Sequence, residues 1–353
     1  MSAHTARWIG GGFWDAFWVL NGVWLMLLAW PFIPEDGRGW GTLHLVYFVP
    51  TALLWLGHRF SSTWLAWFSA AYRPVRRRHP VRFFVVPFAV ATLAFFWLLA
   101  PMSLVPIEPG VRLLWLGVID FGLITWHFSA QHFGVLRLYR ARAGDRGGRR
   151  LDRLVALGLG GAAIVVAELF VGTSLILDAW PQWQRPWHSF RAWAEGPVMV
   201  IIAASTIWAL IRGPAHLGHR LYVVQLGALA LGAMVLPPAA FVFAWTIQHW
   251  SVAMALAGRV VGPRPWRWML MMMVVSVLAL PWLEADVAQS ADAYGPFLFP
   301  TLSAWIQASP LVPTLVAAGF ATGFVHYTLD RAVFRLSDPE VRAAAAHLLE
   351  PPS

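Results

Sequence analysis

Three histidines are each followed by an aromatic residue inside apolar stretches of the chain. They occur in Trp126-His127-Phe128, Gln248-His249-Trp250 and Val325-His326-Tyr327. An ionisable side chain is costly at membrane depth, so it usually faces the interior of a helix bundle and marks a functional site. Imidazole is a good ligand for iron, copper and zinc. The three positions therefore indicate a metal site.

Two further histidines extend this candidate ligand set. His58 lies at the inner end of another apolar stretch, and His132 follows His127 by five residues. Five positions correspond to about 140° around an ideal helix, so both rings reach one centre only across a π-bulge, a feature common at functional sites. Otherwise His132 faces another helix. The expected metal ligands are His127, His249 and His326, completed by either His58 or His132.

Two acidic residues lie where they could orient these ligands. His326 and Asp330 are four positions apart and share one helix face. A carboxylate there can bond the second nitrogen of a metal-bound imidazole. Asp120 lies seven positions before His127, two turns away on the same face. We expect Asp330 and Asp120 to act in the site; the alternative for each side chain is an ordinary polar contact between helices or with interfacial arginines.

The composition indicates that these residues belong to a membrane protein. The chain has 353 residues, of which 59% are hydrophobic and 12% charged, and its mean hydropathy is +0.60. A soluble domain carries about twice that charged fraction. Cysteine is absent, which excludes disulfides, iron–sulfur clusters and thiolate zinc sites. Any metal must be bound by imidazole, carboxylate, carbonyl or water.

Apolar windows of about 20 residues predict an all-α bundle of about ten transmembrane helices. They fall near residues 13–33, 42–60, 82–105, 113–137, 154–172, 196–212, 219–237, 239–258, 266–283 and 311–331. With the N-terminus inside, 22 of the 26 basic residues, all arginines, lie on the cytoplasmic side. This bias orients membrane proteins, so we expect both termini in the cytoplasm and the protein in a bacterial inner (cell) membrane. It also explains the pI of 11.0 without a nucleic-acid partner.

The remaining organisation is simple. Residues 1–336 are predicted to form one transmembrane domain. Residues 337–353 are predicted to form a short cytoplasmic tail helix, because Asp338 and Pro339 suit its N-cap and first position. The glycine-rich run at 158–163 predicts close helix packing. His216 and His219 are expected to be solvated in a cytoplasmic loop.

Two segments resemble the bacterial membrane family of bacteriorhodopsin-related, β-carotene-cleaving dioxygenases. The first is Trp126-His127-Phe128-Ser129-Ala130-Gln131-His132, and the second is His326-Tyr327-Thr328-Leu329-Asp330, followed by Phe334 and Arg335. The resemblance implies an all-helical membrane fold with histidine-bound iron that uses O₂ to cleave a carotenoid. The paired-histidine motif of that family is reduced here to His249 with Ala253, and its Pro-His-Gly motif has no counterpart.

These observations predict an integral membrane oxidoreductase with histidine-bound non-haem iron, or copper, acting with O₂ on a lipid-like substrate. The substrate would be carotenoid-like or fatty. Two alternatives stay open. Two histidines on facing helices could bind haem axially, and a proton-coupled transporter could use Glu168, Asp120 and the histidines as a relay.

Overall fold

The computed structural model describes residues 8–33, 43–170, 180–283 and 299–350. Every regular element within these ranges is a helix, and none of their residues forms a strand, which confirms the expected all-helical class. The chain forms two compact units. Unit 1 comprises residues 1–46, 124–252 and 348–353, and unit 2 comprises residues 47–123 and 253–347.

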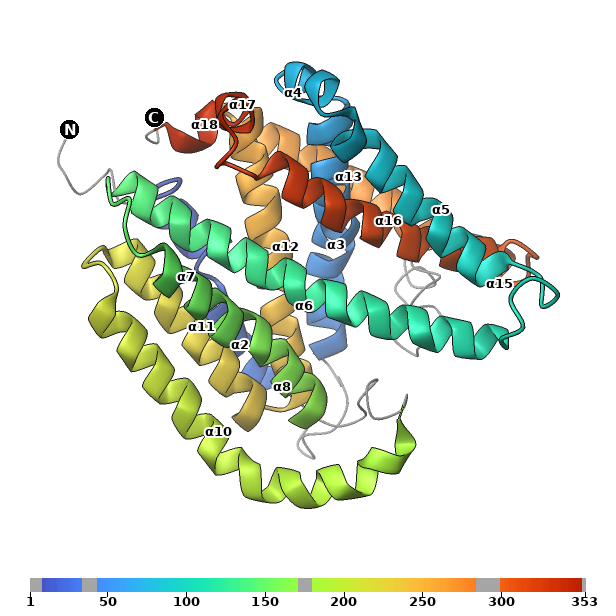
Figure 1. The fold of residues 1–353 in the computed structure, drawn as a ribbon, viewed down its shortest axis with the longest axis horizontal. Coiled ribbons are helices and arrows are strands. Elements are labelled where there is room, and N and C mark those ends of the chain that lie inside the picture. The colour runs from blue at the N-terminus through green and yellow to red at the C-terminus, as the bar shows by residue number, and fades with distance from the viewer. Residues whose placement is uncertain (1–7, 34–42, 171–179, 284–298, 351–353) are drawn as a thin grey trace. The chain divides into compact units, whose positions relative to one another are not determined.

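Unit 1 contains most helices of the N-terminal and central chain. They are α1 (Gly12–Trp18), α2 (Gly22–Ala29), η2 (Trp30–Phe32), α7 (Arg149–Val155), η4 (Ala156–Gly161), α8 (Ala162–Phe170), η5 (Pro181–Trp183), α10 (Gln184–Arg212) and α11 (Leu217–Val235). Helix α11 lies beside α10 and α8 (Figure 1). Helix α11 also packs closely against α2. Glycine permits this approach, because an added Cβ at Gly232 of α11 would lie 2.8 Å from Sδ of Met26 on α2.

Unit 2 contains the remaining short helices and the last long one. They are α4 (Arg73–Arg78), η3 (Val81–Val85), α5 (Val86–Leu99), α13 (Pro265–Leu283), α15 (Pro300–Gln307), α16 (Val312–Val333) and α17 (Pro339–Ala344). Helices α5 and α16 run side by side (Figure 1). Three long helices contribute residues to both units: α3 (Leu43–Trp67), α6 (Pro109–Arg142) and α12 (Pro238–Val261). The chain ends with α18 (Ala346–Leu349).

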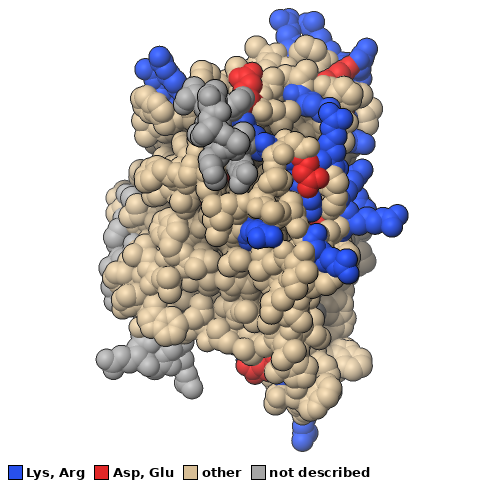
Figure 2. All heavy atoms as spheres, turned by 90° about the vertical axis from the view of Figure 1, so that its left-hand side faces the viewer, with Lys and Arg blue, Asp and Glu red and all other residues tan. Residues whose placement is uncertain are grey.

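Six helices among the described residues are long and apolar enough to cross a membrane, or seven if the bent pair α1 and α2 is one span. The six are η3 with α5, α6, η5 with α10, α12, α13 and α16. Most of the face drawn in Figure 2 carries neither acidic nor basic side chains, as a lipid-facing surface requires. The structure thus supports a multi-pass membrane protein.

The other three predicted windows, 42–60, 154–172 and 219–237, coincide with helices that do not reach this standard, and ten spans stay a prediction. Helix α3 carries Arg59 and several other polar residues. The second window is divided among α7, the π-helical η4 and α8. Helix α11 begins with His219 and Arg220 and carries a buried Gln225, all of which lower its hydropathy.

Polar side chains cap the ends of two helices, α5 and α17. Arg112, which is buried, donates from Nη1 to the carbonyl oxygens of Ala100 (2.6 Å) and Trp97 (3.1 Å) at the end of α5. These are carbonyls that a helix end leaves without intrahelical partners. In the tail, the Asp338 side chain accepts from backbone N–H groups in the first turn of α17, which confirms the predicted N-cap. The locations of the two termini relative to the membrane stay a prediction.

Candidate functional site

Two of the predicted ligands form a pair in unit 2. His58 of α3 and His326 of α16 are both buried. Their ring centroids are 4.8 Å apart and their planes meet at 81°. Two imidazoles from helices far apart in sequence are thus brought edge to face in the interior of this unit.

A hydrogen bond fixes which nitrogen carries the proton in the neutral His58 ring. Nδ1 of His58 lies against the carbonyl oxygen of Trp55, and this Nδ1 must donate because a carbonyl only accepts. The His58 ring therefore presents Nε2 as its basic nitrogen, the form that binds metals. Nδ1 of His326 lies 2.9 Å from Oγ of Ser62, and the tautomer of His326 decides which of the two donates. The Ser62 hydroxyl also lies 3.4 Å from the carbonyl oxygen of Arg59.

Asp330 lies beside His326, as their spacing on one helix face predicts. Its Oδ1 is 3.8 Å from Nδ1 of His326, which is an ion-pair distance but too long for a hydrogen bond. The hydrogen-bond partner of that nitrogen is Ser62, a residue that the sequence does not single out. Asp330 therefore lies beside the ring, while Ser62 makes the hydrogen bond to its Nδ1.

Asp120 makes a separate contact in unit 2. The hydroxyl of Tyr327 donates to Oδ1 of Asp120 at 3.0 Å. Tyr327 directly follows His326, and the rings of these two residues are 5.6 Å apart. Asp120 thus holds the side chain next to a predicted ligand. Tyr327, the aromatic residue that follows His326, is therefore held by its hydrogen bond to Asp120.

Two other predicted ligands form a pair in unit 1. His127 of α6 and His249 of α12 are buried, and their ring centroids are 5.0 Å apart at an interplanar angle of 80°. Phe128 stacks on His249 with a centroid distance of 3.6 Å, and Trp245 lies 4.5 Å from Phe128. Aromatic rings therefore exclude water from this second pair.

His132 points to a different helix. Helix α6 is regular from Pro109 to Arg142, so the π-bulge that would turn His132 towards the His127 side is absent from it. Nδ1 of His132 instead lies 2.8 Å from the hydroxyl of Tyr222 on α11. Its ring packs against Gly160 of η4, where a Cβ would overlap the ring. The close packing predicted for the glycine-rich run is confirmed at this contact.

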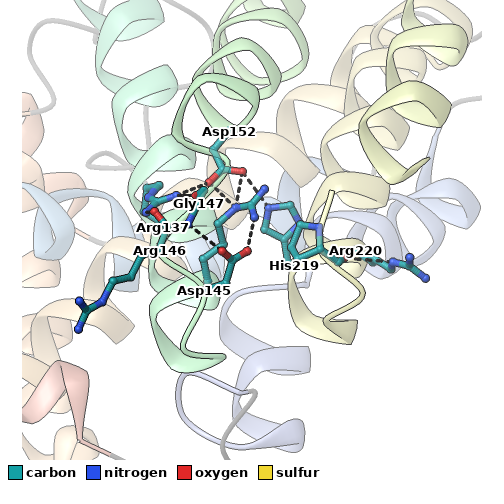
Figure 3. A network of polar contacts seen from close by, with 9 residues as sticks. Arg137, Asp145, Arg146, Gly147, Asp152, His219 and Arg220 are labelled. Atoms are coloured by element: carbon teal, nitrogen blue, oxygen red, sulfur yellow. Dashed lines mark hydrogen bonds and ion pairs between the residues drawn. The ribbon is translucent and has the colours of Figure 1, made fainter. Parts of the chain in front are cut away.

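A buried ionic network, which sequence reasoning missed, lies at the end of α6 in unit 1 (Figure 3). The carboxylate of Asp152 is fully buried. It accepts from Nε of Arg140 (2.7 Å), Nη1 of Arg137 (3.1 Å) and Nε2 of His219 (3.1 Å). Burial alone would raise the pKa of Asp152, but the bonds from His219 and Arg140 hold it below its ordinary value. The expectation that His219 is solvated is therefore wrong.

The same network shapes the loop between α6 and α7. Asp145 pairs with Arg140 and accepts from the backbone N–H of Gly147 at 2.7 Å, a bond that lowers its pKa. Gly148 has a φ of 65° and lies where a side chain would collide with Arg140, so both its conformation and its space require glycine. A sequence signal existed, because Asp152 is the one acid within the arginine-rich stretch 149–153.

The described part of the chain thus contains buried groups of His and Asp side chains that could hold a metal ion. No known family model, curated protein or solved structure matches this chain. A proposal for the function therefore rests on the side chains of the candidate site.

Proposed function

We propose that the protein is an integral membrane oxygenase of the bacterial cell membrane whose buried histidines bind non-haem iron. The proposed ligands are His58, His127, His249 and His326. The observation that carries the proposal is the pairing of buried imidazoles, with Nε2 of His58 left basic by the bond at its Nδ1. Iron held by neutral imidazoles is suited to reaction with O₂. His132 is left out because neither group of described side chains that could hold one ion includes it.

The surrounding residues would tune these ligands. With iron on Nε2, Nδ1 of His326 would donate to Ser62, which lies 2.9 Å away, and a hydrogen bond at the nitrogen opposite the metal fixes the ring and makes it a better ligand. Asp330, 3.8 Å from the same nitrogen, would stabilise positive charge on the ring and the ion. Asp120 would act indirectly by holding Tyr327. These three are positioning residues.

A lipid-like substrate suits the surroundings of the ligands. Phe128 and Trp245 line the His249 ring, and aromatic faces bind apolar chains and conjugated systems without requiring hydrogen bonds. Such a substrate would enter from the bilayer, where it is concentrated. The resemblance to carotene-cleaving dioxygenases makes a carotenoid the first compound to test, and a fatty acyl chain the second.

Metal analysis of the purified protein tests the proposal. We expect stoichiometric iron in the wild type and its loss in the His127→Ala, His249→Ala and His326→Ala variants. His188→Ala is the matched control, because this histidine is exposed on α10 and should leave the iron content unchanged. Unchanged iron in the first three variants, with only a lower melting temperature, would mean that these rings serve helix packing.

The same preparation distinguishes the two alternatives. Rings 4.8 and 5.0 Å apart in edge-to-face contact leave no room for a flat porphyrin between the members of either pair. We therefore expect no haem absorption band, and such a band would replace this proposal with electron transfer. A proton-coupled transporter would contain no stoichiometric iron and would acidify or alkalise the lumen of proteoliposomes.

A further inference from the structure

The first apolar span of unit 1 is interrupted, and side chains rather than helix partners bond its backbone there. Helices α1 and α2 are bent by 54° about the residues between them. Three carbonyl oxygens at the break each accept from a side chain: Phe17 from Nδ2 of Asn21 (3.0 Å), Trp18 from Oγ of Ser251 (3.1 Å) and Val19 from Nε2 of Gln225 (3.0 Å). Helices α11 and α12 thus supply the donors that the broken helix lacks.

Three side chains of this cluster direct their donors to neighbouring oxygens. Nδ2 of Asn21 donates to Phe17 and, at 2.8 Å, to Oγ of Ser251. Nε2 of Gln248 donates to the carbonyl of Val19 at 3.4 Å and to the hydroxyl of Tyr222 at 3.5 Å. The single proton of Ser251 is directed to backbone carbonyls.

Two acceptors remain without any hydrogen bond. Oδ1 of Asn21 and Oε1 of Gln248 are buried and have no partner in the structure, and their residues are 2% and 0% exposed. The Gln248 side chain reaches the break, because its amide nitrogen bonds the carbonyl oxygen of Val19. Unpaired buried amide oxygens are costly. The cluster is therefore rich in oxygen and lacks a positively polarised partner.

The chemistry of the cluster favours a monovalent cation as that partner. Carbonyl oxygens carry a second lone pair, and unwound backbone carbonyls in broken membrane helices coordinate Na⁺. A divalent ion would demand carboxylates. Asp15, the acid of α1, is committed elsewhere, since it accepts from the backbone of Ile9 (2.9 Å) and Gly10 (2.8 Å) and from the hydroxyl of Tyr139 (2.9 Å).

We propose that the break between α1 and α2 binds Na⁺ through Oδ1 of Asn21, Oε1 of Gln248 and the carbonyl oxygens around them. The ion would lock the bent first span onto α11 and α12. This site uses none of the proposed iron ligands, so it stands or falls independently of the oxygenase proposal.

Thermal unfolding of the purified full-length protein in detergent tests the site. Melting temperatures are compared in NaCl, KCl and choline chloride at equal ionic strength, so that charge screening is constant. We expect NaCl to raise the melting temperature by about 2–4 °C with saturation, as a ligand of the folded state does. Equal melting temperatures in the three salts would mean that the break holds only water, and would overturn the proposal.

Substitutions of the proposed Na⁺ ligands test where the ion binds. Asn21→Ala and Gln248→Leu should abolish the Na⁺ effect. Thr206→Val is the control, because the Thr206 hydroxyl bonds only within α10, and it should keep the full effect. If either of the first two fails to fold, Asn21→Asp decides: the added carboxylate should lower the Na⁺ concentration for half the effect at least about threefold. A response that is unchanged in Asn21→Asp, or that persists in Gln248→Leu, would place the ion elsewhere and refute the assignment.

Discussion

Replacing Ser62 by alanine separates metal binding from helix packing at the His326 ring. The change removes the hydroxyl that lies within hydrogen-bond distance of Nδ1 of His326, at 2.9 Å. Its neighbour Ser61 provides a matched control, since Ser61 is also buried on α3 and donates to the carbonyl of Gly57 at 2.8 Å. Ser61→Ala deletes a comparable hydroxyl that makes no recorded bond to a histidine.

The expected magnitudes differ between the two variants. Ser61→Ala loses the bond to Gly57, whereas Ser62→Ala loses the contacts with Arg59 and His326. Each lost bond has a net cost of about 0.5–1.5 kcal/mol in stability, so the melting temperature should fall further in Ser62→Ala. Only Ser62→Ala also frees the ring of a proposed ligand. Loss of such an outer partner weakens metal affinity by roughly 10–100-fold, or about 1.4–2.7 kcal/mol.

Iron affinity is measured by competition with a coloured chelator, beside the melting temperature of the same samples. We expect Ser61→Ala to bind iron as the wild type does and Ser62→Ala to bind it roughly 10–100-fold more weakly. Ser62→Thr, which keeps the hydroxyl, should recover most of the affinity. Equal iron affinities for Ser61→Ala and Ser62→Ala would refute the view that this hydroxyl orients a metal ligand.

Three further outcomes follow from other parts of the molecule. Because the pKa of Asp152 is lowered, the stability that this carboxylate contributes should be complete above about pH 4 and lost as the pH falls further. Asp152→Asn should remove this contribution to the acid dependence. It should also cost about 1–3 kcal/mol, because Arg140 keeps its pairing with Asp145 but loses its buried partner, and this is seen as a lower melting temperature at pH 7. Gly57→Ala should destabilise the protein by about 1–3 kcal/mol, because the added carbon would lie 2.8 Å from a backbone oxygen of α13. Gly122→Ala is the control: its added carbon meets nothing within 4 Å, so the melting temperature should be unchanged or higher. A reporter fused after Ser353 should be active only in the cytoplasm, and periplasmic activity would contradict the predicted topology.

The fold class could be predicted because it depends on the composition of long segments. Seven of the ten apolar windows coincide with helices of membrane length, the bent first pair included. The bend itself could not be predicted, because residues 18–21 form an ordinary apolar stretch with one asparagine. The break is stabilised by Gln225 and Ser251, which lie more than 200 positions away. Long-range side-chain partners of this kind leave no local sequence pattern.

The buried histidines of the candidate site could be predicted from the sequence, but their hydrogen-bond partners could not. Buried histidines in apolar spans stand out because the membrane makes them costly, and the positions of His127, His249 and His326 follow from that alone. Ser62 has no such signal, since serine is common in membrane helices and only its contact with His326 gives it a role. The direction of the His132 ring could not be predicted. It depends on whether α6 is a regular helix or contains a π-bulge, and the five-residue spacing from His127 allows either.

The proton on His58 explains how the unit 2 pair could bind a metal ion. Nδ1 of His58 donates to a carbonyl oxygen, so Nε2 carries no proton when the ring is neutral and can bind a cation. If iron bound Nε2 of His326, Nδ1 of that ring would carry the proton and donate to Ser62, whose own hydroxyl could then donate to the carbonyl of Arg59. A buried imidazolium would have to bear its charge in an apolar interior at the cost of desolvation, whereas a metal ion gains a bond from each neutral ring. The proposed iron site therefore requires a neutral His58 ring and a His326 ring that is protonated at Nδ1.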